Sequence, residues 1–183
     1  MRNLLIILII LMAATFLLPQ VICAQTKAVR KSTDVLCLLP SATAAVLTLV
    51  NKDEKGLKQF VLSTLTSTAL SYGLEACISK ARPDGDGMHS MPSTHTMIAF
   101  SGASFLQRRY GWKWGAPAYA VATYVAWGRT YSKRHDVWDV LVGSAIGVGG
   151  TYIFTRPFMK DVDVSISPAV IDDAKCLSVA ITF

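Results

Sequence analysis

The chain has 183 residues, a length that suits one domain with a sizeable core. Hydrophobic residues make up 52%, charged residues only 16%, and the mean hydropathy is +0.41, which favours a membrane protein over an ordinary soluble domain. The net charge of +6 suits anionic lipid or phosphate. The charge does not indicate nucleic acid as a partner, because the cations are scattered over loops and form no stripe of basic and aromatic residues.

The first 24 residues have the pattern of a secretory signal peptide. Arg2 precedes an apolar run from Leu4 to Leu18, and the segment ends at Ala24, where cleavage is expected. Retention as a first transmembrane helix is the close alternative, and lipid attachment at Cys23 is a weaker one. All three interpretations send the next segment out of the cytoplasm.

Residues 25–34 are expected to form a basic polar linker, and residues 35–156 a helical bundle. Five uncharged runs follow the linker, rich in Ala and Leu and too long for typical strands. We therefore predict an all-α membrane bundle of five to six helices, with a bundle packed on the membrane surface as the alternative. In residues 157–183, apolar and polar residues alternate on both sides of Asp172-Asp173, which predicts a short β-hairpin. The runs are Val35–Val50, Gln59–Leu74, Thr96–Gln107, Trp114–Gly128 and Val140–Thr155.

Crossing the membrane at every run would bring the two charge-rich loops, 79–93 and 129–136, out on one side. With entry into the periplasm after residue 24, that side is the periplasmic face of a bacterial inner membrane. The positive-inside rule barely discriminates here, because both sides hold similar numbers of Lys and Arg.

The densest of these clusters is the stretch from Gly128 to Asp139. His135 and Asp139 are four residues apart, so on a helix they share a face, and the carboxylate can hold one ring nitrogen while the other stays free. The plainer alternative makes Asp136 the N-cap of a helix that starts at Val137, with Asp139 as its third residue.

Two further clusters lie upstream. In Pro92-Ser93-Thr94-His95, Ser93 is a natural N-cap, and its hydroxyl with the first amides of the helix makes an anion cradle beside His95. In Arg82-Pro83, the proline forces Arg82 out of helical conformation at a Gly-rich turn, and arginine is the natural bidentate partner of phosphate. Taken singly, these are also an ordinary capped helix and a surface arginine.

Together, Arg82-Pro83, Pro92-Ser93-Thr94-His95 and Arg129 with His135 and Asp139 resemble the three motifs of the type 2 phosphatidic acid phosphatase family. This family is akin to bacterial acid phosphatases and vanadium haloperoxidases. The resemblance implies their helical fold and a phosphatase that needs no metal or other cofactor. Its substrate would be a lipid phosphomonoester or diphosphate, such as phosphatidic acid, phosphatidylglycerol phosphate, undecaprenyl diphosphate or a lipid A phosphate.

The resemblance also implies a role for each matching residue. His135 would be the nucleophile that forms a phosphohistidine, Asp139 the carboxylate that orients it, and His95 the acid that protonates the leaving oxygen. The phosphate-binding shell would consist of Arg82, Arg129, Ser93 and Thr94.

The sequence departs from the family pattern at three positions. Glu75 stands where the family has lysine, Thr94 where it has glycine, and Gly128 where it has serine. We hypothesise that Lys80 supplies the missing cation from the loop. These departures motivate an alternative, a member that binds anionic lipid phosphate without turnover.

A third function, a metal hydrolase using His89, His95 and His135, lacks any recognised ligand spacing. His89 on its own reads more simply as a solvated loop histidine. The four cysteines show no paired short spacing either, so neither a metal site nor a disulfide framework is expected.

Overall fold

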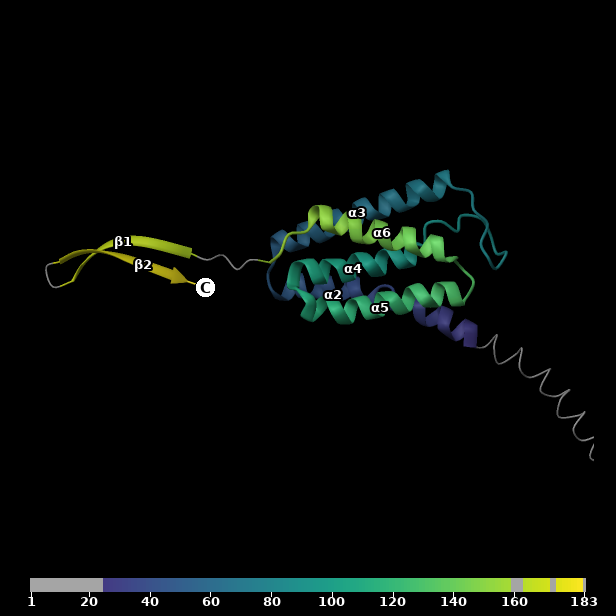
Figure 1. The fold of residues 1–183 in the computed structure, drawn as a ribbon, viewed down its shortest axis with the longest axis horizontal. Helices are drawn as coiled ribbons and strands as arrows, with labels where there is room; N and C mark the ends of the chain where they lie inside the picture. Colours follow the sequence, from purple (N-terminus) through teal and green to yellow (C-terminus); the bar gives the residue numbers. More distant parts are fainter. Residues whose placement is uncertain (1–24, 159–162, 172–173, 183) are drawn as a thin grey trace, which may run out of the picture.

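The computed structural model describes residues 25–158, 163–171 and 174–182. The predicted helical bundle is confirmed (Figure 1). The segment interpreted as a signal peptide or first transmembrane helix lies outside the described residues. The labelled helices are α2 (Leu39–Val50), α3 (Glu54–Cys77), α4 (Thr94–Tyr110), α5 (Trp112–Tyr131) and α6 (Val137–Phe154).

Helices α3, α4 and α5 extend beyond both ends of the apolar runs that predicted them, and α6 starts before its run. Helix α2 instead starts at Leu39, inside the run Val35–Val50. α3 starts at Glu54 because Asp53 caps it, accepting a hydrogen bond from the Gly56 amide at 2.8 Å. With 24 and 20 residues, α3 and α5 reach about 36 and 30 Å at about 1.5 Å per residue, enough for a hydrocarbon core of about 30 Å. Among the described residues, two helical stretches, 25–50 and 137–154, are both long and apolar enough to span a membrane.

The segment expected to be a linker is helical instead, over residues 25–36. It packs along α5, where the Ser32 hydroxyl lies 2.8 Å from the hydroxyl of Tyr124. Thr33 is fully buried, and a Cβ at Gly128 would collide with its side chain. The linker prediction was wrong because Thr33 is the one buried residue of this helix, and a single buried residue in about three turns leaves little apolar periodicity.

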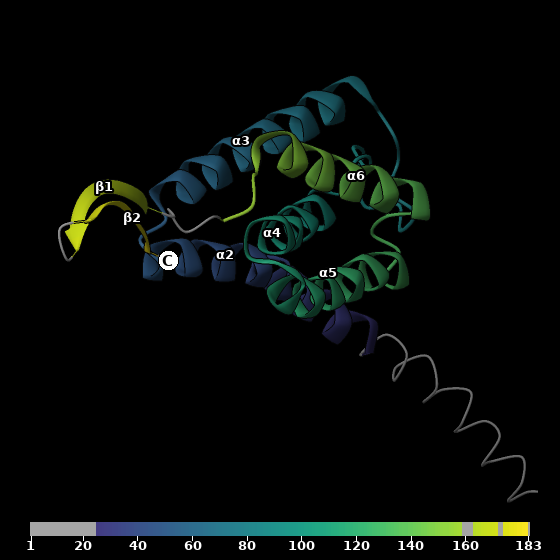
Figure 2. The same cartoon turned by 60° about the vertical axis from the view of Figure 1, so that its left-hand side comes forward.

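Helix α4 lies at the centre of the bundle and packs against α2, α3, α5 and α6 (Figure 2). Its contact with α6 is made by backbone, since a Cβ at Gly143 or Gly147 would collide with the carbonyl oxygen of Ser93 or Met97. Small buried residues between helices and large apolar ones facing outward are typical of a membrane bundle. The exposed apolar residues include Leu49, Val61, Leu65, Leu141 and Ile153.

A buried ion pair fastens one end of the bundle. Arg109 in α4 donates from Nε and Nη2 to the Asp53 carboxylate, at 2.7 and 2.5 Å. Its Nη1 donates to the carbonyl oxygens of Arg156 and Pro157 at 2.9 and 3.0 Å, and the Tyr110 hydroxyl donates to Asp53 at 3.0 Å. This ion pair therefore joins the α2–α3 connection, the end of α4 and the chain after α6.

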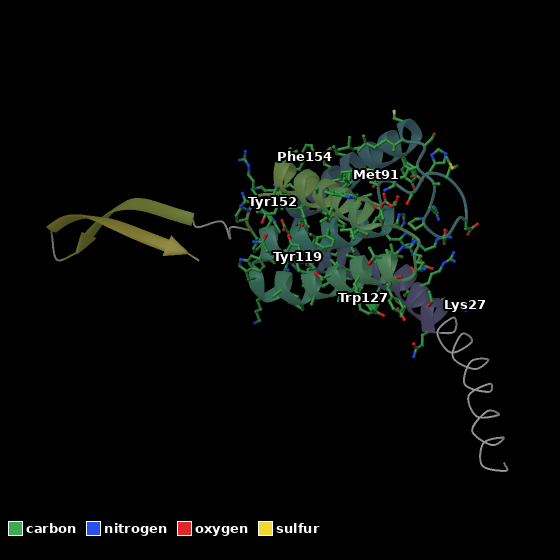
Figure 3. The ribbon with its side chains drawn as sticks, turned by 45° about the vertical axis from the view of Figure 1, so that its right-hand side comes forward. Lys27, Met91, Tyr119, Trp127, Tyr152 and Phe154 are labelled. Atoms are coloured by element: carbon green, nitrogen blue, oxygen red, sulfur yellow. The ribbon has the colours of Figure 1, made fainter. Side chains whose placement is uncertain are left out.

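The charge-rich loops α3–α4 and α5–α6 meet at the other end of the bundle (Figure 1). Figure 3 shows Met91, in the first of these loops, and Lys27 toward this end, and Tyr152 and Phe154 toward the opposite one. The common side that the crossing pattern predicted for the two loops is therefore confirmed.

Beyond the bundle, β1 (Asp163–Ile171) and β2 (Ala174–Thr182) pair antiparallel, with Asp163 opposite Thr182 and Ile171 opposite Ala174. The expected turn at Asp172-Asp173 lies outside the described residues.

Candidate active site

A pocket of about 420 Å³ opens at the loop end of the bundle. It is formed by the helix 25–36, the end of α3, the α3–α4 loop, the start of α4, the end of α5 and the α5–α6 loop. Four arginines and two carboxylates line it, so the pocket carries an excess of positive charge. The lining residues are Arg30, Asp34, Tyr72, Glu75, Arg82, His89, Pro92, Thr94, His95, Arg129, Arg134 and His135.

His135 is 5% exposed and lies at the pocket wall, just before α6. Its Nδ1 is 2.7 Å from the carbonyl oxygen of Ser90. Because a carbonyl can only accept, Nδ1 carries the proton and Nε2 keeps its lone pair. Burial lowers the pKa of the imidazole to about 4, although the Ser90 carbonyl acts in the opposite direction. His135 is therefore neutral at pH 7, the form that a nucleophile or base requires.

Asp139 supports His135 less directly than the sequence suggested. Its Oδ2 lies 3.8 Å from Nδ1 of His135, too far for a hydrogen bond, because the Ser90 carbonyl takes that proton. The carboxylate is fully buried and instead accepts from the Ser90 hydroxyl and from the Asp136 amide. It thus fixes the two residues that border His135.

The alternative interpretation of this segment is confirmed, whereas the expected hydrogen bond between His135 and the Asp139 carboxylate is not formed. Asp136 is the N-cap of α6, and its side chain accepts from the Asp139 amide while the Asp139 side chain accepts from the Asp136 amide, a complete capping box. Asp139 therefore has two roles: it stabilises the first turn of α6, and it places a carboxylate beside His135.

Lys80, expected to supply a cation to phosphate, is placed differently. Its Nζ donates to Asp136 at 2.5 Å and to Asp139 at 2.7 Å, and Lys80 does not line the pocket. Although partial burial acts against it, the two carboxylates raise the pKa of Lys80 and keep it charged. Lys80 therefore compensates the buried charge of Asp139. The position of Lys80 two residues before Arg82 in the sequence could not indicate this role.

His95 lies in the first turn of α4, where the sequence placed it, and lines the pocket. Its Nε2 is 3.3 Å from Oδ1 of Asp34, a residue on the helix 25–36. The start of α4 is tied to α6 by the Ser93 amide, which donates to the carbonyl oxygen of Asp139 at 3.0 Å. Helices α4 and α6 thus present His95 and His135 to one pocket.

Ser93 is the N-cap residue of α4, as predicted, but its side chain does not cap the helix. The hydroxyl is fully buried and lies 3.0 Å from the hydroxyl of Thr96, so it is not available to the pocket as the anion ligand we expected. Thr94, the next residue, does line the pocket.

Three pocket-lining arginines, Arg82, Arg129 and Arg134, share one property. In each, Nε is buried and has no hydrogen-bond partner among the described residues. A buried donor without an acceptor costs about 1–3 kcal/mol, which a bound anion would offset. Arg82 and Arg129 were predicted from their motifs.

Sequence reasoning did not single out Arg134 as a ligand. Its Nη1 donates to Asp84 and Asp86 at 2.9 and 2.7 Å, and these carboxylates raise the pKa of Arg134 against the effect of burial. The charge density around His135 was the available signal, but it did not distinguish Arg134 from its neighbour Lys133, which lies outside the pocket lining.

Glu75 and His89 line the outer part of the pocket. The ring Nδ1 of His89 lies 2.9 Å from the backbone carbonyl oxygen of Glu75, and His89 has a φ of 67°, a left-handed conformation that is costly without glycine. His89 is exposed, as expected, but it is fixed to the end of α3.

Two histidines, one buried and neutral, converge with three incompletely paired guanidinium groups, and this arrangement defines a phosphate-ester hydrolase on a helical membrane scaffold. A family model described as the PAP2 superfamily matches residues 3–162. The chain belongs to the PAP2 superfamily.

Two curated relatives are similar in sequence. The lipid A 4'-phosphatase of Helicobacter pylori strain J99 is 35% identical over 136 residues, which are 68% of this chain and 68% of the relative. The lipid A 1-phosphatase of Porphyromonas gingivalis is 36% identical over 72 residues, 38% of this chain but only 16% of that protein.

Two solved structures are similar in fold. The crystal structure of Aquifex aeolicus LpxE has a TM-score of 0.57 at 23% identity, covering 66% of this chain and 81% of that one. The PAP2-type phosphatidylglycerolphosphate phosphatase of Bacillus subtilis has a TM-score of 0.53 at 26% identity, covering 75% and 74%.

Proposed function

We propose that this chain is a lipid phosphatase that releases inorganic phosphate through a phosphohistidine on His135. The observation that carries the proposal is the juxtaposition of a neutral His135 with three arginines whose Nε atoms are buried and unpartnered. Such donors stabilise the charge that spreads over the equatorial oxygens during phosphoryl transfer.

In the first step, Nε2 of His135 attacks phosphorus and the bond from phosphorus to the ester oxygen breaks. His95 gives its proton to that oxygen, which leaves as the lipid alcohol. In the second step, water attacks phosphorus, the bond from phosphorus to nitrogen breaks, and His95 takes a proton from the water. His135 returns to its neutral form and phosphate is released.

A phosphate of lipid A is the first substrate to test. The H. pylori relative that matches over two thirds of both chains is a lipid A 4'-phosphatase. The apolar outer surface of the bundle would hold acyl chains beside the loop end, where the phosphate would meet the arginines. We propose further that this end faces the periplasm from the inner membrane.

The test is release of inorganic phosphate from a panel of lipid A, phosphatidylglycerol phosphate, phosphatidic acid and undecaprenyl diphosphate. The full chain in detergent is compared with His135→Gln, and acid-labile, base-stable ³²P label on the protein reports the intermediate. Turnover of lipid A that the substitution abolishes supports the proposal.

The second candidate, a member that binds lipid phosphate without hydrolysis, draws on Glu75, a carboxylate in the pocket wall. Binding of the panel lipids with no phosphate release from any of them would favour this function and overturn the proposal.

A further inference from the structure

Asp34 lies in the pocket but outside the three motifs that define the site. Its Oδ1 accepts a hydrogen bond from Nη1 of Arg129 at 2.5 Å and lies 3.3 Å from Nε2 of His95. In the proposed reaction, Arg129 binds a phosphate oxygen and His95 protonates the ester oxygen. One carboxylate oxygen therefore bridges the two groups that the substrate's phosphate would contact.

The helix 25–36 is held where Asp34 can make this contact. The neighbouring residues Ser32 and Thr33 dock on α5, through the hydroxyl of Tyr124 and against Gly128. Arg129 follows Gly128, so the same turn of α5 supplies both the docking surface and the guanidinium that Asp34 binds. A side chain at position 128 would displace Thr33. Because Asp34 is the next residue on the same helix, we expect it to move as well.

The glycine at 128 therefore has a structural reason. A Cβ at this position would collide with Cγ2 of Thr33. The absence of a side chain at Gly128 therefore permits the close approach of the helix that brings a carboxylate into the pocket. Asp34 is 43% exposed, so the carboxylate also has open solvent into which it can move.

We propose that Asp34 is an internal ligand of the phosphate seat: in the free enzyme it occupies the anion position between Arg129 and His95, and the phosphate of the substrate displaces it. The inference rests on the proposed function, because it takes these two residues as phosphate contacts. As a consequence, the apparent affinity for phosphate equals the intrinsic affinity multiplied by the fraction of molecules in which the seat is open.

The experiment measures binding of inorganic phosphate and of orthovanadate by isothermal titration calorimetry, on the full chain in detergent, for the wild type and Asp34→Asn. Asparagine keeps the shape but not the charge that holds Arg129. If Asp34 fills the seat about nine-tenths of the time, the variant binds phosphate about tenfold more tightly. Unchanged or weaker phosphate binding by Asp34→Asn overturns the inference.

Glu75→Gln is the matched control, because it removes one carboxylate from the same pocket wall without a contact to Arg129 or His95. Glu75→Gln should raise the affinity for phosphate by only about twofold at physiological salt, because exposed charges are largely screened there. Equal gains in the two variants would assign the effect to net charge and also overturn the inference.

Gly128→Ala supplies an independent route to the same state, since its Cβ pushes Thr33 away. We expect tighter phosphate binding in this variant, and no further gain when Asp34→Asn is added. Additive gains would show that the two changes act separately, against the inference. A wild type that binds neither phosphate nor vanadate at this pocket would instead contradict the proposed function.

Discussion

His135 is anchored by the main chain of Ser90, whose carbonyl oxygen accepts the Nδ1 proton at 2.7 Å, while the Asp139 carboxylate lies 3.8 Å from the same nitrogen. The backbone carbonyl of Ser90 thus fixes the tautomer of His135. The buried acid acts mainly by holding Ser90 and Asp136 and by its charge.

From this geometry, Asp139→Asn should reduce kcat by about 10- to 100-fold, the range for losing one charged interaction. His135→Gln should abolish turnover. Steady-state kinetics on one lipid phosphate measures both. A loss with Asp139→Asn as complete as that with His135→Gln would show that the carboxylate, not the Ser90 carbonyl, controls the tautomer.

The titration of His135 should be displaced to low pH. Burial lowers its pKa from 6.5 to about 4, so the folded chain binds fewer protons than the unfolded one between these values. The free energy of unfolding does not depend on the titration of His135 above pH 6.5. It decreases by roughly 3 kcal/mol as the pH falls from 6.5 to about 4. NMR of labelled histidine rings in micelles, with His135→Gln for assignment, should give a midpoint near 4. A midpoint between 6 and 7 would contradict the burial of His135.

Substitutions of Lys80 and of Arg134 should affect different properties of the protein. Lys80→Met leaves the buried Asp139 short of its compensating cation, so we expect lower thermal stability and lower kcat with KM changed less than about twofold. Arg134→Gln removes a pocket-lining guanidinium, so KM and the inhibition constant for phosphate should rise about 10-fold or more. Should Lys80→Met raise KM and leave kcat intact, the assignment of Lys80 as a phosphate ligand would be restored.

Reversing the charge at Glu75 tests whether this carboxylate only repels substrate. Glu75→Lys should raise kcat/KM by about 10-fold at low salt, an effect that higher ionic strength reduces. Glu54→Lys, at the far end of the same helix, is the control and should not change kcat/KM. A collapse of activity in Glu75→Lys would show that Glu75 binds the substrate.

The ion pair between Arg109 and Asp53 should matter for stability alone. Both side chains are buried, and removing one partner from such a pair costs about 3–5 kcal/mol. We expect Asp53→Asn and Arg109→Gln each to lower the unfolding temperature in detergent markedly, while specific activity at low temperature stays at the wild-type level. A selective loss of kcat in the folded variants would instead link this end of the bundle to the pocket.

Much of the site could be predicted from sequence because its members fall at fixed spacings in three motifs. Arg82, His95, Arg129 and His135 all line the pocket, on the loops and helix ends that connect the predicted apolar runs. The spacing of residues along the chain does not show, however, in which direction each side chain points. Lys80 is only two residues from Arg82, yet it turns to Asp136 and Asp139, because a buried carboxylate attracts the nearest flexible cation.

Asp34 could not be found from sequence in the same way. It lies on a helix whose charged surface resembles a linker, and it meets Arg129 across 95 residues of chain. The capping role of Asp53 was visible in principle, as an aspartate before a helical run. Its pairing with Arg109 depends on how α3 and α4 pack, which no local pattern contains.

The glycines of α6 have a consequence for how the protein meets its surroundings. The backbones of α4 and α6 are in contact at Gly143 and Gly147, while the leucine and isoleucine side chains exposed on the surface of the bundle would meet the lipids. The spacing between the turn that carries His95 and the turn that carries Asp139 should then stay constant when growth temperature or acyl-chain composition alters the thickness of the bilayer.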